Sequence, residues 1–129
     1  AVKEISIYSN AVKDILDRSV KSFVEDNKSY AMTVEPLEEV IDQLNKDVKK
    51  RHIKRLQKGK CTIELGLLLS DIATNFERVS DHCSNVAVSL LQEEEEGFEA
   101  HGYKGILKTE DNIDFQGRVL AYRNKYILP

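Results

Sequence analysis

Two pairs of carboxylates recur in this sequence at the same spacing. Glu38 and Asp42 are four residues apart, and so are Glu77 and Asp81. Residues four apart lie one above the other on a helix, so each pair places two negative charges on one face. Like charges at this spacing cost a helix about 0.2–0.5 kcal/mol per pair unless a cation or a basic group offsets them. Clustered carboxylates suit hard cations such as Mg²⁺, Ca²⁺ or Mn²⁺, and an added histidine would admit iron or zinc.

The two pairs reach the same level if their segments form an antiparallel helical hairpin with its turn at Gly59. Residues equally distant from the turn then face each other, which sets Glu38 opposite Asp81 and Asp42 opposite Glu77. On a helical wheel the second pair lies roughly opposite the apolar stripe, so we expect the acids on a surface or at an interface between bundles, and not in a dry core. The spacing alone leaves two interpretations open: solvated surface carboxylates, or a metal site.

Three further polar side chains surround the second pair, namely Arg78, His82 and Asn85. His82 lies nearer the flank of the stripe, and we expect a surface histidine or one that packs against another helix, with support of a metal as the alternative. Arg78 either pairs with an acidic neighbour or contacts an anion, and Asn85 caps or bridges helices. Cys61 and Cys83 are expected to be inert thiols, because the sequence marks no base beside either of them.

Helices must position these residues. Apolar residues recur at helical spacing in three long segments, about 2–27, 33–58 and 62–95, and in a short one at about 112–126. Thr33 is the expected N-cap of the second helix, and Gly59 is expected to end it in the left-handed conformation.

Each of these helices has an expected core face. The faces of the first two are Ile5, Tyr8, Val12, Ile15, Leu16, Ser19 and Phe23, and then Leu37, Val40, Ile41, Leu44 and Val48. Those of the last two are Leu65, Leu68, Leu69, Ile72, Phe76, Val79, Cys83, Val86 and Leu90, and then Phe115, Val119, Tyr122 and Tyr126. We therefore predict an all-α domain, an antiparallel three-helix bundle with a short C-terminal helix that covers residues 1–129.

Composition agrees with this fold and narrows the function. The 129 residues suffice for one domain, charged residues make up 32%, and Gly, Pro and Trp are scarce or absent. A net charge of −3 argues against a general nucleic-acid binder. The run from Lys46 to Lys60 holds eight Lys or Arg residues. It is either a solvated helix end matched to the helix dipole, or an attractor of phosphate or anionic lipid headgroups.

Several sequence patterns are absent. No secretory signal and no run of about 18 apolar residues occurs, and two cysteines fit a reducing compartment. The chain does not begin with Met, so we expect a soluble piece of a longer protein. Without a glycine-rich phosphate loop, a Gly-x-Ser-x-Gly elbow or Glu-x-x-His pairs, an enzyme is not expected.

The segments "EPLEEVIDQL", "RHIKRLQKGKC" and "LSDIATNFERVSDHCSNVAV" resemble the PhoU family of phosphate-uptake regulators. The likeness is greatest to the PhoU-like domain at the cytoplasmic C-terminus of bacterial sodium–phosphate cotransporter family proteins. It is strongest at 35–42 and 77–87 and weak between 93 and 113. It implies a three-helix bundle and a non-catalytic domain that controls phosphate uptake at the cytoplasmic side of the inner membrane, as part of a membrane protein.

The resemblance also implies a site and partners. Metal clusters of iron or zinc in that family fall, residue by residue, on Glu38, Asp42, Glu77 and Asp81. The chain departs from the pattern at Asn75, where an acid is frequent, and at Val88. It holds one repeat where PhoU has two, so a homodimer is expected, with the transporter's own membrane domain or the phosphate-transport machinery as partner. The alternative is a purely structural helical dimerisation or docking module without a metal.

Overall fold

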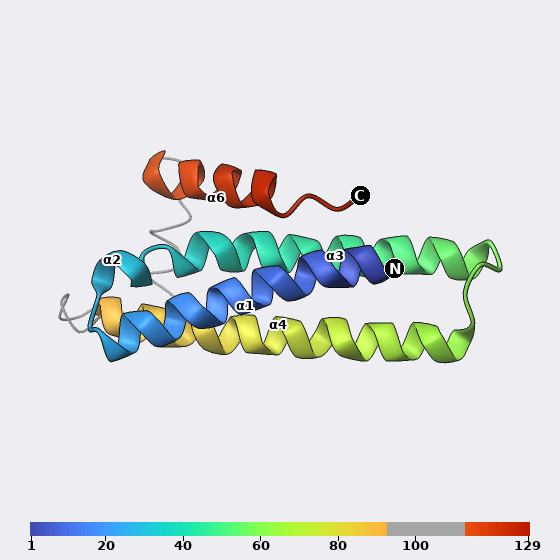
Figure 1. The fold of residues 1–129 in the computed structure, drawn as a ribbon, viewed down its shortest axis with the longest axis horizontal. Helices are drawn as coiled ribbons and strands as arrows, with labels where there is room; N and C mark the ends of the chain where they lie inside the picture. Colours follow the sequence, from blue (N-terminus) through green and yellow to red (C-terminus); the bar gives the residue numbers. More distant parts are fainter. Residues whose placement is uncertain (93–112) are drawn as a thin grey trace.

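The computed structural model describes residues 1–92 and 113–129. These residues form the helices α1 (Val2–Val24), α2 (Lys28–Ala31), α3 (Val34–Gln57), α4 (Ile63–Gln92) and α6 (Ile113–Lys125). Within the described ranges there is no strand. Helices α1, α3 and α4 pack on one another as a three-helix bundle, and α6 lies along α3 (Figure 1). The predicted all-α bundle with a short C-terminal helix is confirmed. The predicted end of the third helix near 95 lies outside the described residues.

The connection between α1 and α3 contains a short helix that the sequence did not predict. Asn27 begins α2, and its side chain accepts a hydrogen bond of 3.2 Å from the Tyr30 amide. Thr33 occupies the N-cap position of α3 as expected, but its side chain makes no cap hydrogen bond there. Instead, the Thr33 hydroxyl donates to the Tyr30 carbonyl at 2.6 Å. This hydrogen bond links the residue before α3 to the backbone of α2.

The turn between α3 and α4 follows the glycine prediction. Gly59 has φ +67, and its amide donates to the Leu56 carbonyl at 3.1 Å while the Lys60 amide donates to the Arg55 carbonyl at 2.9 Å. This pair of bonds closes the helix end in the Schellman pattern, which needs a left-handed residue. Thr62 then caps α4, because its hydroxyl accepts from the Leu65 amide at 3.2 Å. The two helices consequently run antiparallel.

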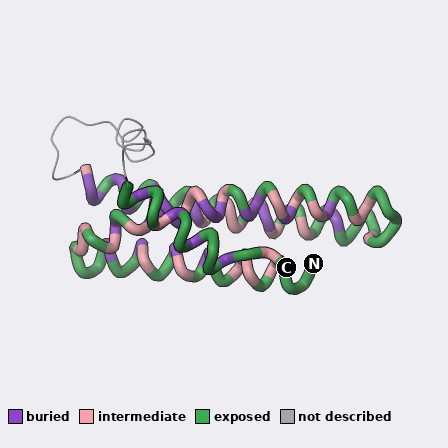
Figure 2. Tube along the Cα trace, turned by 90° about the horizontal axis from the view of Figure 1, so that it is seen from above, coloured by how far each residue is buried: buried purple, intermediate pink, exposed green. Residues whose placement is uncertain are grey.

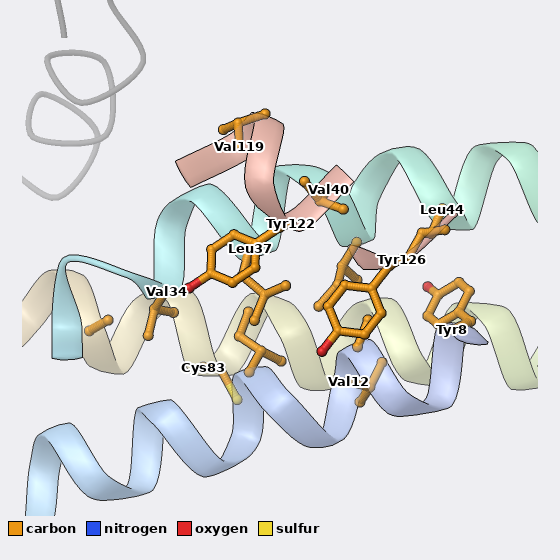
Figure 3. Packing of buried hydrophobic residues seen from close by; sticks show 14 of the residues in the cluster. Tyr8, Val12, Val34, Leu37, Val40, Leu44, Cys83, Val119, Tyr122 and Tyr126 are labelled. Atoms are coloured by element: carbon orange, nitrogen blue, oxygen red, sulfur yellow. The ribbon is translucent and has the colours of Figure 1, made fainter. Parts of the chain in front are cut away.

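The core lies between α1, α3 and α4 and continues under α6. The predicted faces of α3 and α6 are buried throughout. Figure 3 shows Tyr122 of α6, and Tyr126 directly after α6, packed near Val40 and Leu44 of α3 and Tyr8 of α1. Figure 2 shows buried and exposed residues alternating turn by turn along the long helices, as amphipathic helices require.

The predicted core face of α4 is partly wrong. Leu65 and Leu68 are 58% and 56% exposed, and Val86 is 38% exposed. The buried face consists largely of small residues, among them Gly66, Ala73, Ser80, Ser84 and Ala87. Small side chains let neighbouring helices approach closely, so this face turns inward although it is less apolar. In addition, α1 begins short of the α3–α4 turn, so it does not cover the first turns of α4 (Figure 1).

The predicted face of α1 needs a similar correction. Tyr8, Val12 and Ile15 are buried as expected, whereas Leu16 is 47% and Phe23 is 68% exposed. Both exposed side chains face a groove beside α4.

None of the helices in the described part of the chain combines the length and the hydrophobicity that a membrane-spanning helix needs.

Candidate functional site

The four predicted carboxylates lie on α3 and α4, and the hairpin brings the two helices together in nearly the predicted register. Ser84 donates a buried hydrogen bond to Glu35, and these two residues are almost equally distant from Gly59. The Asn45 amide donates to Glu77 at 2.9 Å, about one turn from the predicted level. The sequence therefore predicts the level of the acids to within about a helical turn.

Two of these acids are engaged by neighbouring side chains. Asp42 forms an ion pair of 3.2 Å with Lys46, and Glu77 accepts the bond from Asn45. Asp81 is exposed, while Glu38, Asp42 and Glu77 are half-buried. The helical wheel placed Glu77 opposite the core, and this placement is wrong. The inward face of α4 runs through Ala73 and Ser80, and Glu77 lies beside that face.

The acids do not form a ligand set in this arrangement. Across residues 1–92 and 113–129, no three His, Cys, Asp or Glu side chains come close enough to hold a metal ion. Lys46 and Asn45 instead supply the cation and the donor that offset the like charges. These contacts fit the solvated-carboxylate interpretation, and metal binding itself stays a prediction.

Tyr8 of α1 is close enough to these acids to be affected by their charges. Its buried hydroxyl donates to the Ala73 carbonyl at 3.1 Å. Burial first, and then the negative charges of Glu77, Asp42 and Asp81, raise the pKa of Tyr8. Three of the four predicted acids therefore lie near enough to act electrostatically on one buried hydroxyl, although within the described residues they are not close enough together to hold a metal ion.

The three supporting residues are all exposed on α4. Arg78 is exposed on α4. His82 and Asn85 line a groove between α1 and α4, so the helix that faces His82 across this groove is α1. Neither position assigns these side chains to the acids.

The groove between α1 and α4, which we call the α1–α4 groove, has a volume of about 600 Å³. None of its lining residues is Asp, Glu, Lys or Arg: Leu16, Ser19, Val20, Phe23, Val24, His82, Cys83, Asn85, Val86, Ser89 and Leu90. Val20 and Val24 are 52% and 73% exposed. Sequence reasoning missed this surface because it assigned Leu16, Phe23 and Val86 to the core. The available signal was that apolar residues surround α1 more widely than one core face needs.

The predicted basic run is partly used inside the domain. Glu4 of α1 is buried and accepts from both terminal nitrogens of Arg55, at 3.1 and 3.0 Å, and from Arg51 at 3.4 Å. Burial alone would raise the pKa of Glu4, but the bonds and charges of Arg55 and Arg51 lower it. Arg51 also donates to the Pro129 carbonyl, so the run ties both chain ends to α3.

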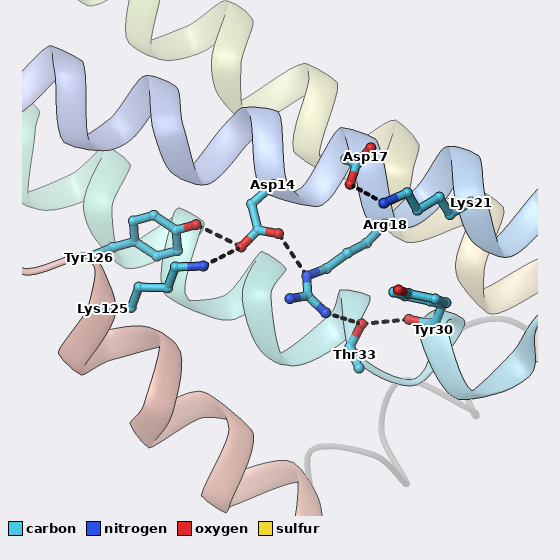
Figure 4. A network of polar contacts seen from close by, with 8 residues as sticks. All are labelled: Asp14, Asp17, Arg18, Lys21, Tyr30, Thr33, Lys125 and Tyr126. Atoms are coloured by element: carbon cyan, nitrogen blue, oxygen red, sulfur yellow. Dashed lines mark hydrogen bonds and ion pairs between the residues drawn. The ribbon is translucent and has the colours of Figure 1, made fainter.

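A second polar cluster fixes α6 to α1 (Figure 4). Asp14 accepts from Arg18 at 2.8 Å, from the Tyr126 hydroxyl at 2.6 Å and from Lys125 at 3.5 Å. Arg18 also donates to Thr33 at 3.1 Å. Burial opposes ionisation of Asp14, yet the hydrogen bonds of Tyr126 and Arg18 lower its pKa.

The hairpin end holds a thiol–imidazole pair that the sequence did not predict. His52 is 6% exposed, and its Nε2 lies 4.0 Å from the Sγ of Cys61. Gly66 leaves the space for the ring, since a Cβ there would lie 2.6 Å from Nε2. The expectation that no base neighbours Cys61 is therefore wrong. His52 and Gly66 are equally distant from Gly59, so the hairpin register would have predicted that His52 faces Gly66. It would not have predicted that His52 lies beside Cys61.

Comparison with known proteins identifies the family of this chain. The sequence profile of the PhoU domain family matches residues 5–90, and the chain belongs to this family. The phosphate-specific transport system accessory protein PhoU homolog 1 of Thermotoga maritima is 27% identical over 90 residues. That match covers 70% of this chain but only 39% of the relative's length. No solved structure matches the chain.

Proposed function

We propose that this chain is a non-catalytic regulatory domain that controls phosphate uptake by a sodium-dependent phosphate transporter at the cytoplasmic face of the membrane. Its membership of the PhoU family supports this role, as does a relative described as an accessory protein of phosphate transport. The sequence likeness of the α3 and α4 segments to domains of sodium–phosphate cotransporters supports the sodium-dependent context. The observation that carries the proposal is the open, uncharged α1–α4 groove on a bundle of this family.

The regulatory role is tested by phosphate uptake in cells that express the whole parent protein. Val20→Glu places a charge in the α1–α4 groove, where Val20 is 52% exposed. Leu120→Glu is the matched control, since Leu120 is 58% exposed on α6, outside the groove. The proposal predicts that Val20→Glu alone abolishes the response of uptake to external phosphate. An unchanged response in both variants would contradict it.

The occupant that we propose for the groove is a second copy of this chain. More than half of the Thermotoga relative lies outside the matched segment, which leaves that protein enough length for another bundle. This chain carries one bundle, so a second copy would supply the corresponding partner. An uncharged groove avoids the cost of burying unpaired charges when two identical surfaces meet.

Sedimentation equilibrium tests this association. The wild type and Leu120→Glu should dimerise, whereas Val20→Glu should weaken the dimer by at least about 100-fold. This estimate combines the lost burial of a valine, about 1.5–3 kcal/mol, with the cost of desolvating a carboxylate, at about 1.4 kcal/mol per factor of ten. A wild type that stays monomeric at all concentrations would contradict the dimer.

A second candidate function is a structural docking module without a metal. The pairing of Asp42 with Lys46 and of Glu77 with Asn45 favours it, because both carboxylates have protein partners. Elemental mass spectrometry of the purified protein tests the two alternatives, beside a variant with all four acids changed to amides. Stoichiometric iron, zinc or manganese that disappears in the variant would support a metal-binding regulator. Metal-free protein in both would support the docking module.

A further inference from the structure

We propose that Cys61 is a thiol modification site whose base is His52, and that it forms mixed disulfides with small anionic disulfides. The inference concerns the α3–α4 turn, away from the α1–α4 groove, so it is independent of the regulatory proposal above. It begins with the environment of the imidazole. His52 is only 6% exposed, and its Nδ1 has no hydrogen-bond partner among the described residues. Burying an unsatisfied nitrogen costs about 1–3 kcal/mol, so a ring kept there calls for a reason.

The second step is the geometry of the thiol. Cys61 is half-buried, so small reagents can reach it. Its Sγ lies 4.0 Å from His52 Nε2, the outer limit of a hydrogen bond to sulfur, and 3.5 Å from the Thr62 carbonyl. The thiol proton therefore has two acceptors, of which only the imidazole can take it up. A thiol within reach of an imidazole is the arrangement that generates a nucleophilic thiolate.

The charges around the pair favour an anion. Cys61 lies two residues before Ile63, the first residue of α4, so it is close to the helix end whose dipole stabilises negative charge. Lys58 and Lys60, three residues and one residue before Cys61 in the chain, are exposed. Of the other charged groups nearby, Lys49 is engaged by a threonine of α4, Arg55 is engaged by α1, and Glu64 is exposed in the first turn of α4. The lysines would stabilise both the thiolate and an incoming anionic reagent.

A metal ion fits these residues less well. No third His, Cys, Asp or Glu joins the pair in the described part of the chain. A histidine that binds a metal also donates its second N–H to an acceptor, and Nδ1 of His52 has none there. Thiol–disulfide exchange needs neither a third ligand nor an acceptor for the second ring nitrogen.

The proposed step is a thiol–disulfide exchange. The thiol proton of Cys61 passes to Nε2 of His52, and the resulting thiolate attacks one sulfur of the disulfide. A new S–S bond forms to Sγ while the reagent's own S–S bond breaks. The leaving thiolate takes the proton back from the imidazolium. Cys61 is oxidised, half of the reagent is reduced, and no further oxidant is needed.

Cys83 supplies an internal reference in the same chain. It is buried between α1 and α4, its carbonyl accepts from Ser19, and burial raises the pKa of its thiol. A buried thiol without a base should react slowly. The native protein should therefore react at Cys61 at least about 100-fold faster than at Cys83.

The test follows the reaction of native protein with oxidised glutathione by peptide mass spectrometry, from pH 5 to pH 9. Cys61 should react at pH 7 at least about tenfold faster than the same residue in urea-unfolded chain, because only the folded chain holds the His52 imidazole 4.0 Å from the thiol, where it can take up the proton. His52→Gln should remove this excess and move the pH profile to that of the unfolded chain. Circular dichroism checks that the variant is folded, and the comparison of native with unfolded wild type holds even if it is not.

A second comparison tests the lysines. Replacing Lys58 and Lys60 with Gln should slow the reaction with oxidised glutathione about threefold to tenfold at low salt, and leave that with uncharged hydroxyethyl disulfide nearly unchanged. A native Cys61 that reacts no faster than the unfolded chain, or a pH profile unaltered by His52→Gln, would overturn the proposal. Equal effects of the lysine substitutions on both reagents would overturn the preference for anions.

Discussion

The carboxylate of Asp14 is the centre of the contacts that hold α6 to α1, and its replacement gives a quantitative prediction. Asp14→Asn keeps the size of the side chain but removes its charge and one acceptor. The bonds from Arg18 at 2.8 Å and Tyr126 at 2.6 Å are both affected. Hydrogen bonds to charged groups contribute about 1.5–3 kcal/mol each, and partial exposure reduces their sum. The expected loss is about 2 kcal/mol in the free energy of unfolding.

Asp17→Asn is the matched control on the same helix (Figure 4). Asp17 pairs with Lys21 at 3.1 Å, but the two side chains are 61% and 47% exposed, against 16% for Asp14. An exposed i,i+4 pair contributes about 0.3–0.5 kcal/mol. Since 1 kcal/mol corresponds to about 3–4 °C for a chain of this length, Asp14→Asn should lower the Tm by about 7 °C and Asp17→Asn by less than about 2 °C.

The assay is urea and thermal unfolding followed by circular dichroism at pH 7. A double-mutant cycle of Asp14→Asn with Tyr126→Phe isolates the bond between the two helices, and we expect a coupling of about 1 kcal/mol. Equal effects of Asp14→Asn and Asp17→Asn, or no coupling in the cycle, would refute the reasoning.

The same carboxylate predicts a pH dependence. The pKa of Asp14 is lower in the folded protein, because the bonds of Tyr126 and Arg18 outweigh the opposing effect of burial. A group whose folded-state pKa is lowered contributes stability above its unfolded value, about 3.9 for aspartate, and loses it as the pH falls through the folded-state value. The difference in stability between wild type and Asp14→Asn should therefore be largest at neutral pH and shrink below about pH 4. A difference that stays constant down to pH 2 would contradict this assignment.

Two further substitutions test the packing around the bundle. Gly66→Ala places a Cβ 2.6 Å from His52 Nε2 and should destabilise by about 1–2 kcal/mol, the strain of overpacking less the gain in helix propensity, whereas Gly117→Ala meets open space and should stabilise by about 0.5–1 kcal/mol. Urea unfolding of both measures this, and a stabilised Gly66→Ala would show that the hairpin end yields freely. Tyr8→Phe removes the bond to the Ala73 carbonyl and should cost about 1 kcal/mol in the same assay; a gain in stability would contradict a stabilising contribution from this bond.

Much of the fold can be predicted from the sequence, because α3 and α6 each carry a single apolar face. Leu37 and Val119 are buried where their spacing places them. The inward face of α4 could not be predicted by hydropathy, since leucines surround its first turns and the bundle selects small side chains such as Ala73 for close packing. The length of α1 decides that Leu65 stays exposed, and helix length relative to a neighbour is a tertiary property.

The candidate site divides in the same way. The turn at Gly59 predicts the level of the acids, because a hairpin fixes the register of its two helices. It does not predict that Asp42 turns to Lys46 or that Glu77 turns to Asn45, since side-chain rotamers decide these pairings. The α1–α4 groove is likewise invisible to a search for core faces, which treats every apolar residue as internal.

The central claim is that the α1–α4 groove is a docking surface, and hydroxyl-radical footprinting tests it most directly. Phe23 in the groove is 68% exposed and Leu120 on α6 is 58% exposed, so both should be oxidised readily in dilute isolated domain. In concentrated protein, where the proposed dimer forms, we predict strong protection of Phe23 and unchanged oxidation of Leu120. Equal oxidation of Phe23 in the two samples would contradict the account.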